Sequence, residues 1–363
     1  MKQKLVIVLG LVAWLAVTVV AQKPGPPKLE PTPATESQAQ LLREGVALHD
    51  KGDYAGAIKN YEAVLSENPN NVHALYEMAY SYFTRKDYQK SIEAGYRAAQ
   101  YKSDLLAAIY VQLGSSFDEL GEPKKAIEIY KAGIKLEPKD SFLYYNLAVT
   151  YKRTGELDDA RAAVKKAAIL NPAHPSSQLL LSTLFQKAGY KWPALLAALR
   201  FLILEPRTAR SDSALRLVRE AMQAGVSAGK NPNEINISVD MSPQKKDEGD
   251  FDSIATFMGL AKAANYTDEN KGKSEMALLG ENVGSLIAFL SESRNKSDRS
   301  KFVWTYYLPY FAEMKEKGHL EAFAYYTNQR SNIAGVNEWL EQNQPKIVAF
   351  LVWSKHYRWP AID

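Results

Sequence analysis

Apolar and polar positions alternate along most of the chain with the period of an amphipathic helix. Leu41 and Leu48, and then Tyr54 and Tyr61, recur seven residues apart, a spacing that places such residues on one face of a helix. Glycine and proline interrupt this pattern at intervals, and both residues favour helix ends. The pattern predicts a series of short amphipathic helices.

The same order of residues returns at a fixed interval. Pro138, Pro172 and Pro206 follow one another 34 residues apart. A glycine lies 17 residues before each of these prolines and before Pro69, at Gly52, Gly121, Gly155 and Gly189. Small residues also recur earlier in each unit, at Gly45, Ala79, Gly114, Ala148 and Ser182. The second unit departs from the pattern and carries Lys86, Ser91 and Ser103 at corresponding places. These marks predict five units, which begin near Gln38, Val72, Ala107, Ser141 and Pro175.

Each mark has a physical reason in a pair of antiparallel helices. Small residues in the middle of a helix let two backbones approach closely. Glycine adopts a positive φ at low cost where the first helix ends, and proline stops the second helix. Each unit therefore predicts two helices joined by a tight turn.

Two units carry the full set of marks. The first runs from Ala107 to Lys139 with Tyr110, Leu113, Gly114, Phe117, Gly121, Ala126, Tyr130 and Pro138. The second runs from Ser141 to Pro172 with Tyr144, Leu147, Ala148, Tyr151, Gly155, Ala160 and Ala167. This pattern resembles the tetratricopeptide repeat over about half of the chain, from Gln38 to Pro206. The resemblance implies an all-α fold in which about five helix pairs stack into a right-handed superhelix.

In proteins of that family, the first helices line a concave side that holds a peptide or a segment of a partner protein. The register carries this role to thirteen residues here: His73, Tyr76, Tyr80 and Phe83 in the second unit, Val111, Ser115, Asp118 and Glu119 in the third, and Tyr145, Asn146, Val149, Lys152 and Arg153 in the fourth. The resemblance thus implies a partner-binding groove that is aromatic at one end and mixed in charge at the other. The alternative is that these rings pack only on neighbouring helices. The fourth unit, with Asn146, Lys152 and Arg153, also resembles part of a basic clamp for a C-terminal carboxylate, but the first and third units supply no matching basic residues.

The rest of the chain divides by composition. We expect a signal peptide or N-terminal anchor at 1–21, a proline-rich spacer at 22–37, the repeat array with a capping helix at 38–225, a linker at 226–250 and an aromatic-rich helical domain at 251–363. The capping helix, from Ser211 to Gly225, would cover the apolar end of the array. Within the linker, alternation at Ile235, Ile237 and Val239 predicts a short strand with no evident partner edge, which would lie along a helix.

The C-terminal region predicts helices at 251–264, 274–293, 301–317, 320–328 and 336–357. It resembles no family that we recognise. Its aromatic residues recur at helical spacing, which favours a buried core, with a surface for a glycan or another ligand as the alternative. They are Phe302, Trp304, Tyr306, Tyr307, Tyr310, Phe311, Trp339, Phe350, Trp353, Tyr357 and Trp359.

The N-terminus indicates export. Lys2 and Lys4 precede an uncharged apolar run from Leu5 to Val20, with a small residue, Ala21, at its end. This arrangement is typical of a secretory signal. It predicts a protein of the periplasm or the extracellular space, or one anchored in a membrane by residues 5–21 if the segment is retained.

Composition bears mainly on what the chain lacks. The chain has 45 Lys and Arg residues and 41 Asp and Glu residues, which gives a net charge of +4. A charge this small argues against a nucleic-acid partner. There is no cysteine and the five histidines occur singly, so we expect no metal site and no cofactor. Phosphate-binding loops and nucleophile elbows are also absent from the sequence, so we do not expect an enzyme.

Three hypotheses remain for the function. The first is a scaffold or adaptor that binds a protein or peptide partner in the groove of the repeats. The second is a structural component of the cell envelope whose C-terminal aromatic helices bind glycan or membrane. The third is an enzyme with an unfamiliar site in the C-terminal helices.

Overall fold

The computed structural model describes residues 25–223, 225–231, 234–238, 246–270, 272–292 and 298–362. The expected signal segment, 1–21, lies outside these residues. In the described part, no helix is long and apolar enough to cross a membrane.

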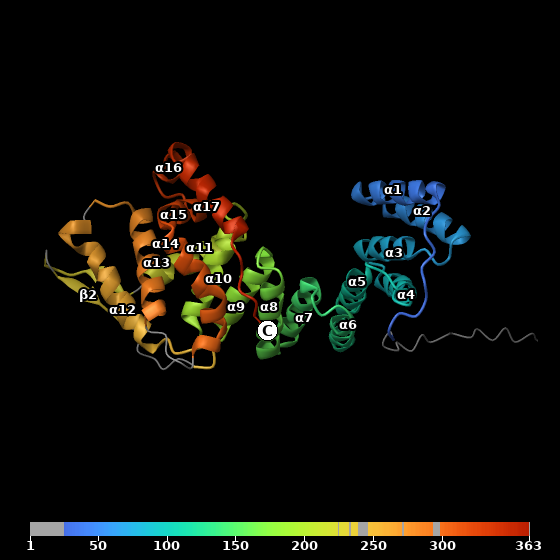
Figure 1. The fold of residues 1–363 in the computed structure, drawn as a ribbon, viewed down its shortest axis with the longest axis horizontal. Coiled ribbons are helices and arrows are strands. Elements are labelled where there is room, and N and C mark those ends of the chain that lie inside the picture. Colours follow the sequence, from blue (N-terminus) through green and yellow to red (C-terminus); the bar gives the residue numbers. More distant parts are fainter. Residues whose placement is uncertain are drawn as a thin grey trace, which may run out of the picture.

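Ten helices form five antiparallel pairs that stack in series (Figure 1). The pairs are α1 (Glu36–Asp50) with α2 (Tyr54–Glu67), α3 (Val72–Thr84) with α4 (Tyr88–Ala98), α5 (Leu106–Glu119) with α6 (Pro123–Leu136), α7 (Ser141–Thr154) with α8 (Leu157–Leu170), and α9 (Pro175–Lys187) with α10 (Lys191–Leu204). The first helix of each pair begins within two residues of the predicted start of its unit. The all-α superhelical fold expected from the sequence is confirmed.

The turn inside each unit needs a residue with positive φ. The four predicted glycines provide it, with φ between 79° and 89°. In the second unit Lys86 occupies the same place with φ of 68°, although this conformation costs a residue with a Cβ roughly 1–2 kcal/mol. The backbone of the second unit thus follows the others despite its divergent sequence.

Size complementarity fixes the crossing of the two helices within a unit. A Cβ placed on Gly45 would lie 2.5 Å from the ring of Tyr61, and one on Gly114 would lie 2.3 Å from the ring of Tyr130. Both tyrosine rings are buried. The absence of a side chain at the glycine therefore makes room for the tyrosine ring on the opposite helix.

The residues before α1 lie against the turns that connect successive units. Lys28 and Leu29 donate backbone hydrogen bonds to the Gln100 carbonyl, and the Lys102 backbone N–H donates to the Leu29 carbonyl. Asn68 donates from its side chain to two further carbonyls of this segment. Part of the proline-rich segment is thus held against the array.

After the fifth unit the chain forms α11 (Ser211–Gln223), which packs on α10 as the capping helix was expected to do. Two short strands follow, β1 (Val226–Ala228) and β2 (Ile235–Ile237), and they pair antiparallel. The expectation that this strand would lack a partner edge is therefore wrong, because the chain turns back and supplies the edge itself. Val239 lies outside the described residues.

The C-terminal region is helical, as predicted. It comprises α12 (Asp252–Ala263), two 3₁₀ turns at Ala264–Tyr266 and Asp268–Asn270, α13 (Glu275–Glu292), a 3₁₀ turn at Asp298–Ser300, a π-helical turn at Val303–Tyr307, α14 (Leu308–Glu316), α15 (Leu320–Thr327), α16 (Val336–Gln342) and α17 (Gln344–His356). The single helix predicted over 336–357 is two helices, which meet at Asn343 ahead of Pro345. Proline favours the first turn of a new helix.

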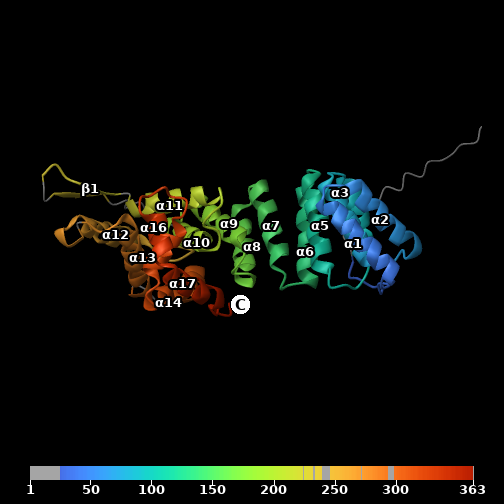
Figure 2. The same ribbon diagram turned by 90° about the horizontal axis from the view of Figure 1, so that it is seen from above.

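The C-terminal helices gather around α10 and α11 at one end of the array, and the end of the chain lies beside α8 (Figures 1 and 2). The aromatic residues from Phe302 to Phe311 are buried, so the core interpretation holds for them. Tyr306 donates to the Ala168 carbonyl, and Tyr307 donates to the Gln178 side chain. Arg200 on α10 donates to Tyr310 at 2.9 Å. The described residues of the repeats and of the C-terminal region thus share one hydrophobic core.

Candidate functional site

The first helices of successive units form one side of the array. Helices α1, α3 and α5 each contact the next first helix, whereas successive second helices hardly touch. Closer spacing on one side curves a stack toward that side. We call the side formed by α1, α3, α5 and α7 the inner face.

The thirteen residues of the predicted groove lie on these helices, and none of them is buried. Large apolar side chains are exposed on three of the four helices, namely Val46 at 37%, Tyr80 at 41% and Phe142 at 48%. The described C-terminal residues pack elsewhere, against α8, α10 and the buried side of α9. Within the described residues, the C-terminal region therefore leaves the inner face of the first four units uncovered.

The end of the inner face nearest α1 is aromatic and acidic. Tyr80 stacks on His49 of α1 with ring centroids 4.7 Å apart, and Nδ1 of His49 lies 2.8 Å from the Ser81 hydroxyl. Glu77 is half-buried beside these rings. Its burial, and to a lesser degree the Asp50 carboxylate, raise the pKa of Glu77. Burial likewise raises the pKa of Tyr76, followed in effect by the charge of Glu77.

Phe83 and His73 complete this end. The ring of Phe83 packs against Tyr88 of α4 at 5.5 Å, so it is shared between the inner face and the unit's own second helix. His73 is exposed. Phe83 thus packs on a neighbouring helix and is still partly exposed on the inner face.

The centre of the inner face is polar. Arg153 of α7 makes an ion pair with Asp118 of α5, and its guanidinium also donates to the Asp118 carbonyl at 3.1 Å. The Ser115 hydroxyl lies 3.1 Å from the Tyr130 hydroxyl. Glu119 is exposed and Val111 is half-buried. The ion pair neutralises the charge of Arg153. Because its two residues lie on α5 and α7, it also joins the third and fourth units.

The far end of the inner face is formed by α7 and the turn before α9. His174 packs edge-on against Tyr145 at 4.8 Å and against Phe142 at 5.3 Å. Asn146 donates to the Phe142 carbonyl at 2.8 Å. Val149 is half-buried. This end presents aromatic edges together with one amide.

Lys152 is the remaining predicted residue. It is exposed and forms no ion pair with any residue that the structure describes. Asn146 is bonded to its own helix and Arg153 is paired with Asp118. Of the two basic residues that resemble part of a clamp, Lys152 is therefore the one without an ion pair among the described residues.

The sequence interpretation missed several residues of this face. Val46 and His49 of α1 and Phe142 of α7 occupy the same register positions as residues that were predicted in other units. The register was applied to the second to fourth units only, and extending it to the first unit would have found the first two. Glu77 lies five residues after the start of its unit, as the predicted Asn146 does in the fourth unit, so the same register applied to the second unit would have found it.

Within the described ranges, no three His, Asp or Glu side chains are grouped so that they could hold a metal ion.

Comparisons with known proteins agree with this architecture. Models of the tetratricopeptide repeat match residues 42–104, 107–140 and 129–162. The C-terminal region is not recognised by a family model. The chain is 30% identical over 140 residues to photosystem I assembly protein Ycf3 of Prochlorococcus marinus, strain MIT 9211, a match that covers 34% of this chain and 80% of that protein.

Two further matches concern the same region. The TPR repeat-containing protein MJ1428 of Methanocaldococcus jannaschii is 29% identical over 117 residues, which are 32% of this chain and only 20% of that protein's length. The crystal structure of TTC0263, a TPR protein of Thermus thermophilus, is 25% identical, with a TM-score of 0.42, and the match covers 49% of this chain and 99% of that one.

The stacked helix pairs define a helical-repeat solenoid whose inner face is left uncovered by the part of the C-terminal region that the structure describes. The chain belongs to the tetratricopeptide-repeat proteins, a class of protein-interaction scaffolds.

Proposed function

We propose that this protein is an exported scaffold or adaptor that binds a segment of a partner protein on its inner face. The observation that carries the proposal is that three of the four first helices expose a large apolar side chain on the inner face, namely Val46, Tyr80 and Phe142. Single exposed apolar residues need no explanation, whereas several on one face are a feature of interaction surfaces. The relationship to an assembly protein, Ycf3, is in keeping with this role.

The composition of the face suits a peptide. Tyrosine and histidine rings supply large contact areas with few rotatable bonds, and aromatic residues are enriched at the energetic centres of interfaces. Glu77 and Lys152 lie toward opposite ends and would fix the direction of a bound segment through charge. Export rests on residues 1–21 of the sequence alone.

A library of random peptides selected on the full chain tests the proposal. Peptides that bind the wild type should lose at least about tenfold in affinity when Tyr76, Tyr80 and Phe83 are replaced by alanine, because truncation of a central aromatic residue typically costs about 2 kcal/mol or more. A matched control replaces the exposed apolar residues Leu260, Val348 and Val352, which lie on α12 and α17, away from the inner face. Equal losses in both triple variants, with the helical circular dichroism unchanged, would exclude the inner face as the binding surface.

A further inference from the structure

Arg200 of α10 is a buried cation without a carboxylate partner. It is 3% exposed and forms no ion pair with any residue that the structure describes. Its guanidinium donates to the Tyr310 hydroxyl at 2.9 Å, to the Ser354 hydroxyl at 3.2 Å and to the Pro172 carbonyl at 3.3 Å. These acceptors are all uncharged, and Nε of Arg200 has no hydrogen-bond partner among the described residues. A buried charge is unfavourable unless its surroundings compensate it.

Two aromatic rings provide this compensation. The guanidinium carbon lies 4.6 Å from the ring centroid of Tyr310 and 5.0 Å from that of Trp359. Aromatic faces attract cations at such distances, and the attraction is larger where water is excluded. The Trp359 ring is also stacked on Tyr310, with centroids 5.0 Å apart, and on Tyr306, with centroids 4.6 Å apart. Arg200, Tyr306 and Tyr310 thus all contact one indole ring, and we call these three residues the indole slot.

The segment that carries this indole is held by side chains alone. Residues 357–362 follow α17 and run as an extended stretch to the end of the chain beside α8 (Figure 1). They neither donate nor accept a hydrogen bond with any described residue. The segment is attached through the half-buried side chains of Tyr357, Trp359 and Ile362, whereas the rings of Tyr306 and Tyr310 behind it are fully buried. The slot is therefore filled by a segment that can leave without breaking a hydrogen bond.

We propose that the indole slot is a binding site for a tryptophan side chain of another polypeptide, and that residues 357–362 form a releasable strap that fills it with the chain's own Trp359. Release of the strap removes one of the two aromatic faces from Arg200 and uncovers the rings of Tyr306 and Tyr310. An aromatic side chain replaces both the ring stacking and the contact with the cation, whereas an aliphatic one replaces only the burial. The slot lies on α10, the π-helical turn and α14, so it is independent of the inner face.

Fluorine NMR of the full chain labelled with 5-fluorotryptophan tests the proposal. The Trp359 resonance is assigned by its loss in Trp359→Phe, and the probe is N-acetyl-L-tryptophanamide, which supplies an indole without a tether. Addition of the probe to the wild type should shift the Trp359 resonance toward that of solvent-exposed 5-fluorotryptophan, because the probe and the strap compete for one slot. N-acetyl-L-leucinamide at the same concentration should leave the resonance unchanged, since its side chain has no π face.

The affinity for the probe gives a second measurement. A strap that is open in at most about one molecule in ten lowers the apparent affinity of the slot at least about tenfold, so Trp359→Ala should bind the probe at least about tenfold more tightly than the wild type. The matched control is Trp339→Ala in α16, since Trp339 is likewise half-buried, stacked on Tyr325 at 4.0 Å and approached by Lys346 at 5.6 Å. Its cation is exposed and already paired with Glu321, so this variant should bind the probe as the wild type does.

The role of the buried cation is measured in the Trp359→Ala background. Addition of Arg200→Met should weaken the probe about fivefold or more, because the ring then lacks its cation, and circular dichroism checks that each variant is folded. Equal affinity of the single and double variants would overturn the proposal, as would Trp359→Ala binding the probe no more tightly than Trp339→Ala. A wild-type Trp359 resonance that stays in place under conditions where Trp359→Ala binds the probe would overturn the releasable strap.

Discussion

Glu248 provides a quantitative test of how the C-terminal region is attached to the repeats. It is 4% exposed and accepts hydrogen bonds from Arg161 at 2.9 Å and from Lys165 at 2.6 Å, both on α8. Asp247 beside it pairs with Arg161 and with the Tyr190 hydroxyl. The segment before α12 is thus bound to the fourth unit through the buried Glu248 and to the turn of the fifth unit through the exposed Asp247.

Glu248→Gln removes the negative charge and keeps the shape of the side chain. Loss of one partner from a buried ion pair typically costs about 3–5 kcal/mol, because it leaves the other charge unpaired. Arg161 retains Asp158, whose carboxylate lies 2.8 Å away, and glutamine can still accept one hydrogen bond. We therefore expect a decrease of about 3 kcal/mol in the free energy of unfolding, at the lower end of that range.

Urea unfolding followed by tryptophan fluorescence measures this decrease. All tryptophans in the described residues lie in α10 or the C-terminal region, so the signal reports the part that Glu248 anchors. With a urea dependence of about 1–3 kcal/mol per molar, the midpoint should fall by about 1 M or more. The matched control is Glu321→Gln, since Glu321 pairs with Lys346 at 2.7 Å on the surface and such pairs contribute about 0–1 kcal/mol.

A second variant tests the electrostatic reasoning itself. Replacing Glu248 and Lys165 together by methionine removes the negative charge and one of the two cations that face it, so this double variant should be more stable than Glu248→Gln. If Glu248→Gln shifts the midpoint no more than Glu321→Gln does, the buried charges do not hold the two parts together.

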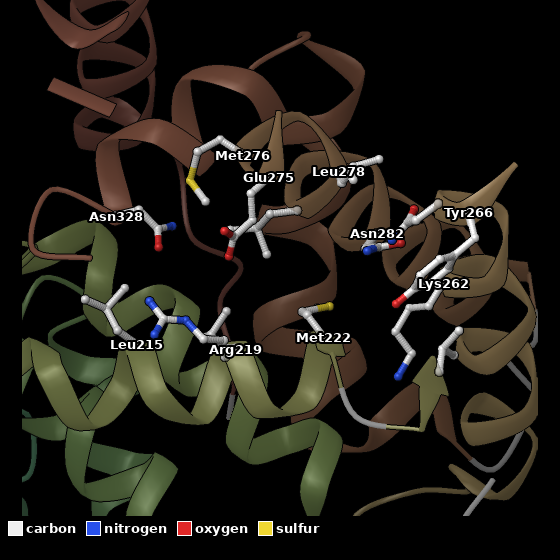
Figure 3. A pocket seen from close by; sticks show the side chains of 14 residues that line it. Leu215, Arg219, Met222, Lys262, Tyr266, Glu275, Met276, Leu278, Asn282 and Asn328 are labelled. Carbon is white, nitrogen blue, oxygen red and sulfur yellow. The ribbon is translucent and has the colours of Figure 1, made fainter. Parts of the chain in front are cut away.

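Three other substitutions and conditions give direct checks. Lys86→Gly should stabilise the protein by about 0.5–1 kcal/mol, because glycine relieves the positive φ of that turn; a lower urea midpoint would contradict this. Gly114→Ala should destabilise it by about 1–3 kcal/mol, since the added methyl group would overlap the buried ring of Tyr130, and an unchanged midpoint would show that the two helices can move apart. Lys262 of α12, which lies among side chains of α11 and α13 (Figure 3), is 6% exposed, and burial lowers its pKa to about 8. The stability of the wild type relative to Lys262→Met should therefore rise as the pH increases from about 8 to the unfolded lysine pKa of about 10.5, because the unfolded lysine binds more protons than the folded one in this range. A flat difference between pH 8 and pH 10.5 would contradict the lowered pKa of Lys262.

The repeat half of the fold was predictable because its constraints are local. Pro138, Pro172 and Pro206 each follow the end of a second helix by two residues, and a proline acts on its own helix wherever the rest of the chain lies. Lys86 shows the limit of this reasoning. The residue breaks the sequence pattern, yet neighbouring units hold its turn in the same conformation.

The arrangement of the C-terminal helices was not predictable because it depends on contacts between distant parts of the chain. Arg161 meets Glu248, and Gln178 meets Tyr306, more than 80 residues apart in each case. One local signal was available, however. Helix α10 is apolar on all sides, which indicates a helix surrounded by others rather than one at the surface of an array.

The candidate sites divide in the same way. The inner-face residues follow from the repeat register, and their use by a partner stays a prediction. The division of the chain into separate domains is likewise still a prediction. The burial of Lys262 could not be foreseen, because Lys262 resembles any other lysine of an amphipathic helix until α11 and α13 pack around it.

The enclosure of α10 limits how this solenoid can change its length during evolution. A repeat array normally lengthens or shortens by duplication or loss of whole units, since each unit contacts only its neighbours. Here the fifth unit also contacts the C-terminal helices through Gln178 and Arg200, so an extra unit inserted after it would separate those partners. Gain or loss of units is therefore confined to the stretch before α8, where the inner face could be extended without disturbing the far end.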